Sequence, residues 1–175
     1  MIVSSQQTTR PLVAVIGGGA VTQKQYQLAR DVGYGLARGG VDVVCGGLGG
    51  VMEAASRGCR EGGGNVIGLL PGSNADDANP WASYPLPTGL GHARNMLVAQ
   101  SAPVVIAIAG EYGTLSELAI ALKTGRVVVT LGGWQDIPGV CCAHDADQAV
   151  AMALDALIAR DCLHTGSGSD VDKES

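Results

Sequence analysis

Residues 103–132 read "PVVIAIAGEYGTLSELAIALKTGRVVVTLG", with an apolar run rich in β-branched residues at each end. Such runs are typical of parallel strands that are covered on both faces. Between them, Leu115, Leu118, Ala119 and Leu122 recur at the spacing of one helix stripe. A helix between two buried strands predicts a βαβ unit, in which the strands run parallel.

The same alternation continues through the rest of the chain. Further strand-like runs are "LVAVIG", "VDVVCG" and "NVIGLLP", and helical patterns cover residues 22–38, 50–61, 91–101 and a final stretch from Asp145 or Asp147. Thr22 is a suitable N-cap for the first of these helices. We therefore predict an α/β fold: a three-layer, Rossmann-like, doubly wound and mostly parallel sheet with helices on both faces. Ligands bind such sheets at the carboxyl ends of the strands.

The least regular stretch covers residues 72–89, which we interpret as a candidate lid or rim loop. It contains "ASYPLP" around Tyr84, a weak strand pattern whose prolines favour an edge position or a loop. Trp81 lies in the same stretch, where it could stack on a ligand ring or serve in ordinary packing.

The 175 residues fit a single Rossmann-like domain spanning residues 1–175, with residues 1–10 and 164–175 expected to be flexible polar ends. The beginning of the chain has no signal-peptide pattern, and no apolar run is long enough to span a membrane. The net charge of −5 argues against a nucleic-acid partner. Five cysteines without a C-x-x-C pair favour a reduced, cytoplasmic setting and no metal site.

Three glycine-rich turns follow predicted strands. In "VIGGGAVT", Gly17 and Gly19 begin a dinucleotide fingerprint, but its third glycine position falls on Thr22. We interpret this turn as one that lets a ligand approach the backbone. The second turn, "CGGLGGVMEAASRG", contains four glycines before a helix. They could serve close packing of helix on sheet, or expose backbone N–H groups to an anion.

The third turn lies in "AGEYGTLSEL", where Gly110 and Gly113 precede Thr114. Thr114 and Glu117 match the capping box that begins many helices. The glycines are equally consistent with an anion site at a helix N-terminus. In "GLGHARN", Arg94 opens another predicted helix, either as a surface residue or as an anion clamp.

The segments "GGLGGVMEAASRG", "GHARN" and "GEYGTLSELAIALKTG", in this order, resemble the LOG-like proteins, formerly called lysine decarboxylase-like. This Rossmann-type superfamily also includes molybdenum-cofactor carrier proteins and is distantly related to the DNA-processing protein DprA. The resemblance covers about residues 12–131. It implies that the family arginine falls on Arg94, the family glutamate on Glu117, and the phosphate-binding turn on Gly110, Gly113 and Thr114.

The chain departs from the LOG signature at three positions. Ala109 replaces a proline, Glu111 replaces a glycine, and Asn95 replaces a lysine. A carboxylate at Glu111 would repel a bound phosphate unless it pointed away. These departures resemble the carrier branch more than the LOG enzymes.

The resemblance implies a site that binds a phosphorylated, nucleotide-like ligand. One hypothesis is hydrolysis of the N-glycosidic bond of a nucleoside 5′-monophosphate, with Arg94 and Glu117 as catalytic residues and no cofactor required. The alternative is a non-catalytic carrier of the molybdenum cofactor, and a third is a structural or regulatory protein with a vestigial pocket. The resemblance also implies a homo-oligomer, a dimer or a tetramer, as does the apolar surface of the two last predicted helices.

The candidate ligand-binding residues come from the three glycine turns and the arginine segment. They are Gly17, Gly18, Gly19, Gly46, Gly47, Gly49, Gly50, Met52, Arg94, Asn95, Gly110, Glu111, Tyr112, Gly113, Thr114 and Glu117.

Overall fold

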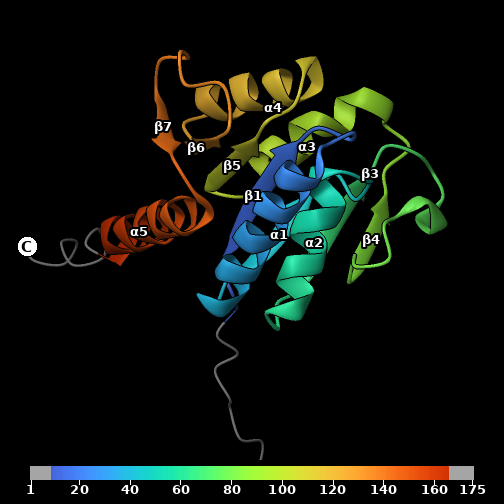
Figure 1. The fold of residues 1–175 in the computed structure, drawn as a ribbon, viewed down its shortest axis with the longest axis horizontal. Coiled ribbons are helices and arrows are strands. Elements are labelled where there is room, and N and C mark those ends of the chain that lie inside the picture. The colour runs from blue at the N-terminus through green and yellow to red at the C-terminus, as the bar shows by residue number, and fades with distance from the viewer. Residues whose placement is uncertain (1–8, 166–175) are drawn as a thin grey trace, which may run out of the picture.

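The computed structural model describes residues 9–165, which form a parallel sheet between two layers of helices (Figure 1). The sheet order is β4-β3-β2-β1-β5-β6-β7, and every described pair of neighbouring strands is parallel. The strands are β1 (Leu12–Gly17), β2 (Asp42–Cys45), β3 (Val66–Leu70), β4 (Tyr84–Pro87), β5 (Val104–Ile108), β6 (Val127–Leu131) and β7 (Val140–Ala143). The predicted fold class is confirmed.

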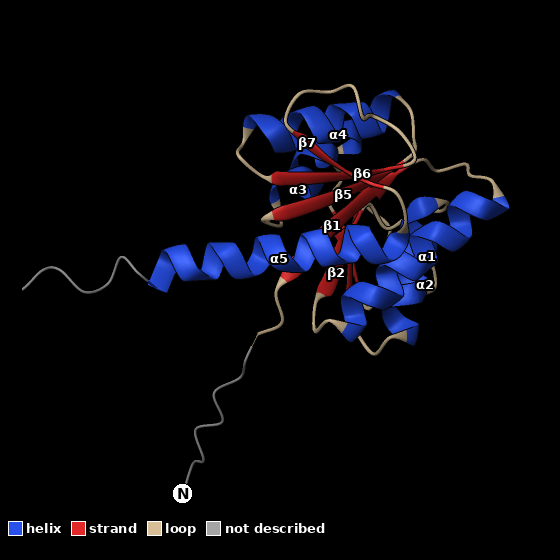
Figure 2. Ribbon diagram, turned by 60° about the vertical axis from the view of Figure 1, so that its left-hand side comes forward, coloured by secondary structure: helices blue, strands red, loops and turns tan. Residues whose placement is uncertain are grey.

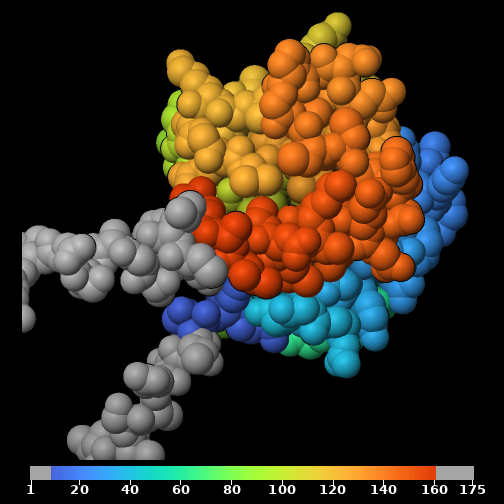
Figure 3. Space-filling view, turned by 90° about the vertical axis from the view of Figure 1, so that its left-hand side faces the viewer, coloured from blue at the N-terminus to red at the C-terminus, as the bar shows by residue number. Residues whose placement is uncertain are grey.

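Helices cover both faces of the sheet (Figure 2). One face carries α1 (Gln23–Arg38), α2 (Val51–Glu61) and α5 (Ala146–Thr165), and the other carries α3 (Arg94–Gln100) and α4 (Tyr112–Lys123). Short 3₁₀ turns occupy Ala75–Asp77 and Gly91–Ala93. Figure 3 shows α5 lying across the surface between the chain around β6 and β7 and the helices α1 and α2.

The alternation of side chains along β1 divides the core into two parts. Val13 and Val15 face the layer of α1, α2 and α5, whereas Ala14 and Ile16 face α3 and α4. All four are almost completely buried. Burying a valine or isoleucine side chain contributes about 1.5–3 kcal/mol, so a doubly covered strand of this kind anchors the fold.

The first helix and the two edge strands show how far local sequence patterns determine the elements. Thr22 caps α1 in a capping box with Gln25, as the sequence predicted for this end of the helix. The "ASYPLP" pattern forms β4 at one edge of the sheet, which confirms the edge position. The opposite edge strand, β7, has no counterpart in the sequence prediction.

No residue of the candidate lid or rim loop at residues 72–89 lines the pocket described below. Its Asn79 is buried, and its backbone N–H donates to the Gly47 carbonyl oxygen at 2.8 Å. The Asn79 side chain donates to the Leu48 carbonyl oxygen at 3.1 Å, so this stretch is fastened over the turn after β2. Trp81 packs under the guanidinium of Arg57, whose Cζ lies 5.5 Å from the ring centroid. The packing role is therefore the one that the structure supports for Trp81.

Most of the two expected flexible ends lie outside the described residues. Arg10, in the expected N-terminal arm, is held by an ion pair of 2.9 Å to Asp42 and by a hydrogen bond of 2.7 Å to the Ala37 carbonyl oxygen. His164 and Thr165, placed in the polar tail, are the last residues of α5. No helix within residues 9–165 is long and apolar enough to cross a membrane.

The winding of the sheet reverses between β1 and β5. These strands are neighbours, and Gly17 at the end of β1 pairs with Ile108 at the end of β5. The chain then leaves in opposite directions, to α1 on one face and α4 on the other. Such a switch point opens a crevice at the carboxyl ends of the strands, where ligands bind in open α/β sheets.

Candidate functional site

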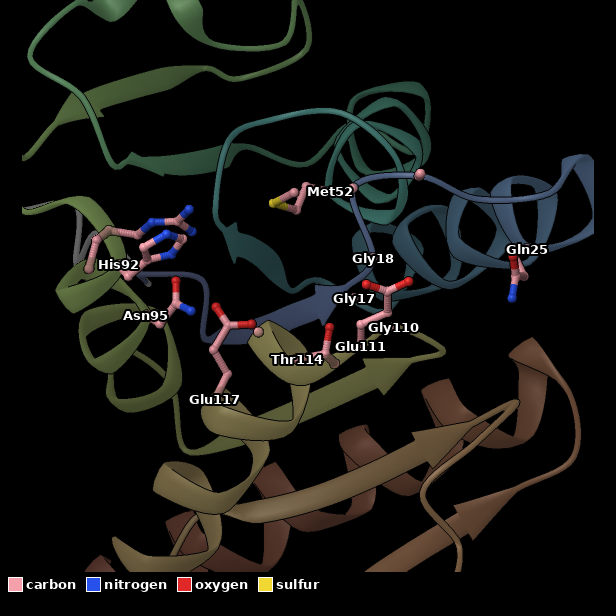
Figure 4. Close-up of a pocket in the computed structure, with 14 residues that line it drawn as sticks. Gly17, Gly18, Gln25, Met52, His92, Asn95, Gly110, Glu111, Thr114 and Glu117 are labelled. Atoms are coloured by element: carbon pink, nitrogen blue, oxygen red, sulfur yellow. The ribbon is translucent and has the colours of Figure 1, made fainter.

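A pocket of about 430 Å³ lies at this switch point (Figure 4). Its size is within the range of small-molecule sites. The turns after β1 and β5 and the first turns of α3 and α4 supply most of its wall. The lining residues are Gly17, Gly18, Gly19, Ala20, Gln25, Met52, His92, Arg94, Asn95, Gly110, Glu111, Gly113, Thr114 and Glu117.

The turn after β1 brings the backbone close to the neighbouring strand and leaves its outer part open. A Cβ atom at Gly17 would lie 2.5 Å from the Ile108 carbonyl oxygen, so only glycine fits at this point of contact. At Gly19, by contrast, a Cβ atom would meet no other atom within 4 Å. The exposed backbone of Gly19 therefore faces space that a ligand can enter.

The turn after β5 is formed by two residues in the left-handed region, Ala109 with φ 47° and Gly110 with φ 102°. Proline fixes φ near −65°, so a proline at 109 could not adopt this conformation. Glycine at 110 is required by packing as well, because a Cβ there would overlap the Thr114 hydroxyl group.

The predicted capping box at Thr114 and Glu117 is wrong. The N-cap residue of α4 is Glu111, and its side chain makes no capping hydrogen bond. The helix begins three residues earlier than the capping pattern indicated, because the left-handed pair at 109 and 110 already turns the chain. The first N–H groups of α4 have no acceptor within the helix, and they carry the positive end of its dipole. This end forms part of the pocket wall.

Arg94 and Glu117 both line the pocket and are both buried, with 7% of each residue exposed. Within residues 9–165 they form no ion pair with each other, and the buried Nε of Arg94 has no hydrogen-bond partner. Burial lowers the pKa of Arg94, while Glu117 and Cys45 act in the opposite direction. Burial raises the pKa of Glu117 to about 7, although the positive charge of Arg94 opposes this shift.

The four glycines after β2 do not line the pocket, and the structure supports a packing role for Gly46, Gly47 and Gly50. A Cβ at Gly46 would overlap Arg94, and one at Gly50 would overlap the Gly18 carbonyl oxygen. The first N–H group of α2, that of Val51, donates to the same Gly18 oxygen at 3.0 Å. This helix end is therefore closed by the turn after β1. The absence of side chains at Gly46 makes room for the guanidinium of Arg94.

The other predicted residues separate into two groups. Met52, Asn95 and Glu111 line the pocket, whereas Tyr112 points into solvent and is 86% exposed. Figure 4 shows Asn95 and Glu117 near His92 at one end of the pocket, with Glu111 between Gly18 and Thr114.

Three lining residues were missed in the sequence, namely Ala20, Gln25 and His92. His92 belongs to the "GHARN" segment, so a signal was present without an assigned role. Gln25 was detectable only through its part in the α1 capping box.

Cys45 lies buried beside Arg94 and contacts the Ser56 hydroxyl group at 3.5 Å. Burial raises the pKa of this thiol, which therefore stays protonated and unreactive at neutral pH. No group of His, Cys, Asp and Glu residues suited to hold a metal ion occurs in the described part of the chain.

The arrangement is suited to hold an anion. The Arg94 side chain, the amino end of α4 and the glycine backbone of two turns all border one space. Glu111 adds a carboxylate at the wall of this pocket. It favours a ligand that presents hydrogen-bond donors in addition to its negative charge.

The chain is similar to several known proteins. The SLOG cluster4 family model matches residues 10–161. An uncharacterized protein of Archaeoglobus fulgidus is 37% identical over 146 residues, which are 83% of this chain and 96% of the relative.

Two solved structures cover 86% of this chain and 99% of their own chains. They are the molybdenum cofactor binding protein of Rippkaea orientalis, with 31% identity and a TM-score of 0.82, and the molybdenum cofactor carrier protein of Chlamydomonas reinhardtii, with 33% identity and a TM-score of 0.80. DprA of Streptococcus pneumoniae, with 21% identity and a TM-score of 0.66, shares the fold. The resemblance inferred from the glycine and arginine segments is confirmed: this chain belongs to the SLOG cluster4 family.

Proposed function

We propose that this protein binds the molybdenum cofactor in the pocket between β1 and β5 and carries it without transforming it. The observation that carries the proposal is the match, over almost their whole length, to two proteins that bind or carry this cofactor. The pocket supplies the physical support. The cofactor is a pterin with a phosphate group and a dithiolene that holds molybdenum, so it needs a site for an anion and a site for a polar ring.

The pocket residues fit both parts of such a ligand. Arg94 lines the pocket, where its guanidinium can donate hydrogen bonds to an anion. Amide groups at the start of α4 offer further donors. Glu111 and Asn95 can accept hydrogen bonds from the amino and ring N–H groups of a pterin.

One feature of the site favours carriage over catalysis. Hydrolysis of an N-glycosidic bond uses an ionised carboxylate beside the ribose, and burial raises the pKa of Glu117 to about 7, so only part of the molecules carry this charge at neutral pH. The Glu111 carboxylate also lines the pocket, but it would repel the phosphate of either candidate ligand, so it does not separate the two functions.

Hydrolysis of a nucleoside 5′-monophosphate is the second candidate function. It is favoured by one observation, namely that Arg94 and Glu117 line the same pocket at the switch point. In this alternative, Glu117 would stabilise the developing charge on the ribose and Arg94 would hold the ligand.

The test compares two variants, Arg94→Met and Arg57→Met, with the wild type. Arg57 lies on α2, outside the pocket, and stacks on Trp81. Anaerobic equilibrium dialysis with molybdenum cofactor should show binding by the wild type and by Arg57→Met. Arg94→Met should bind at least about tenfold more weakly, because a hydrogen bond to a charged group is worth about 1.5–3 kcal/mol.

The same three proteins are then incubated with a panel of nucleoside monophosphates. The carrier hypothesis expects no free base, and it expects loaded protein to activate an apo-molybdoenzyme. Release of base and ribose 5-phosphate, lost in Glu117→Gln, would establish the hydrolase instead. Equal cofactor binding by Arg94→Met and wild type would refute the proposed site.

A further inference from the structure

Two non-glycine residues of the described chain have left-handed backbone conformations, and they contact each other. Ala109 has φ 47° and Trp134 has φ 64°. The Trp134 indole Nε1–H donates a hydrogen bond of 2.8 Å to the Ala109 carbonyl oxygen. Each such conformation costs about 1–3 kcal/mol and persists only where its surroundings hold it.

Ala109 is the residue through which β5 turns into the pocket. Its N–H group donates to the Leu131 carbonyl oxygen at 3.1 Å, at the end of β6. Its own carbonyl group accepts the bond from Trp134, so β6 and the loop that follows it hold both backbone polar groups of this residue. The next residue, Gly110, lines the pocket, and α4 begins two residues later.

Trp134 itself does not line the pocket. It is partly buried and packs against the core on the side of α3 and α4. The loop that carries it begins with Gly132, whose φ of 76° bends the chain away from β6. The indole N–H bond to Ala109 is therefore a direct physical link between this loop and the pocket wall.

We infer that Trp134 is a positioning residue for the ligand site. By holding Ala109 in its left-handed conformation, it fixes the direction in which Gly110 and the first N–H groups of α4 face the pocket. This role rests on the proposed function for the identity of the ligand, but the positioning of the turn can be measured in the free protein.

The experiment compares Trp134→Phe with Trp81→Phe, because the protein has these two tryptophans. Each substitution removes one indole N–H and keeps an aromatic ring, but Trp81 packs on Arg57 outside the pocket. Loss of one neutral hydrogen bond should weaken binding of molybdenum cofactor, or of inorganic phosphate, by about 2- to 10-fold in Trp134→Phe. Trp81→Phe should bind like the wild type.

Testing Trp134→Phe in the Ala109→Gly variant distinguishes a positioning role of Trp134 from a general loss of packing. Ala109→Gly removes the cost of the left-handed conformation, because glycine adopts it freely. Adding Trp134→Phe to Ala109→Gly should then change affinity by less than about twofold, a non-additivity typical of directly coupled residues. A purely structural role would give the same loss in both backgrounds, and that result would overturn the inference.

Amide NMR of the free protein provides a readout that does not depend on the ligand. Trp134→Phe should shift the Gly110 and Gly113 resonances and speed their amide exchange, whereas Trp81→Phe should leave them unchanged. Unchanged resonances at both glycines would refute the positioning role. If the wild type bound neither probe, the proposed function would fail, while these resonances would still decide the inference about Trp134.

Discussion

In the turn after β2, protein atoms occupy the space beside Gly46, Gly47 and Gly50, whereas in the turns after β1 and β5 the space beside Gly19 and Gly113 is open. A side chain at Gly46 would overlap Arg94, and one at Gly50 would overlap the Gly18 carbonyl oxygen. A side chain at Gly19 or Gly113 would meet nothing within 4 Å. We call residues 46–50 the closed turn, and residues 17–19 with 110–113 the open turns.

The difference shows two physical uses of the same residue. In the closed turn, glycine allows helix α2, the turn after β1 and the Arg94 guanidinium to approach one another. In the open turns, Gly19 and Gly113 keep the entrance free of side chains next to backbone N–H groups. The closed turn therefore supports the site without lining it. Substitutions in this turn should lower the free energy of unfolding more than they lower ligand affinity.

The largest effect is expected for Gly50→Ala in the closed turn. Gly50 has φ 66°, which is unfavourable for alanine, and the new Cβ would overlap the Gly18 carbonyl oxygen. We expect the free energy of unfolding to fall by about 3–5 kcal/mol, from backbone strain and overpacking together. Urea unfolding at pH 7, followed by circular dichroism, measures this loss.

Gly49→Ala provides the matched control in the same turn. A Cβ at Gly49 would lie 3.8 Å from the Gly19 carbonyl oxygen, which is an ordinary van der Waals contact. This variant should unfold within about 1 kcal/mol of the wild type. Equal losses for Gly49→Ala and Gly50→Ala would contradict the description of the closed turn.

The second effect concerns Glu117, in the helix that follows an open turn. Its pKa rises from 4.5 to about 7 on folding, so the folded protein binds a proton more tightly than the unfolded chain. The contribution of Glu117 to the free energy of unfolding is fully present below pH 4.5, where its carboxyl group is protonated. It is lost as the pH rises through about 7. At 1.36 kcal/mol per pH unit, the loss is roughly 3 kcal/mol.

Glu117→Gln removes this titration and keeps the shape of the side chain. The variant should match the wild type at pH 4 and exceed its unfolding free energy by up to about 3 kcal/mol at pH 8. Urea unfolding of both proteins at intervals of one pH unit gives the difference curve. A constant difference between pH 4 and 8 would show that Glu117 has an ordinary pKa in the folded protein.

The sequence was sufficient for the fold wherever an element had a strong apolar pattern. The runs that became β1, β5 and β6 are buried on both faces, and their spacing predicted a parallel sheet. The strand β7 was missed because Val140 is its one large β-branched residue and two of its four residues are exposed cysteines. Its pairing with β6 depends on tertiary contacts that no local pattern reports.

The site was predictable in its parts and less so in its geometry. The arginine segment and the turn after β5 were identified, and Arg94 and Glu117 border one pocket as the sequence analysis required. The capping pattern at Thr114 was misleading, because a left-handed alanine at position 109 starts the helix earlier. A positive φ at a residue other than glycine has no sequence signal, since it is imposed by the surrounding structure.

The smallest effect on stability, and the most direct test of the open turns, is expected for Gly113→Ala. Its Cβ would meet no protein atom, and alanine is favoured over glycine in a helix, so the free energy of unfolding should stay equal or rise by up to about 1 kcal/mol. The added methyl group nevertheless occupies pocket space beside the first N–H groups of α4, so affinity for molybdenum cofactor should fall about tenfold. Equilibrium dialysis and urea unfolding on the same preparation measure both quantities, with Gly49→Ala as the control outside the pocket. Because the fold tolerates alanine at both positions, weaker binding by Gly113→Ala alone would mean that this glycine serves ligand access, whereas unchanged binding would place the ligand away from the start of α4.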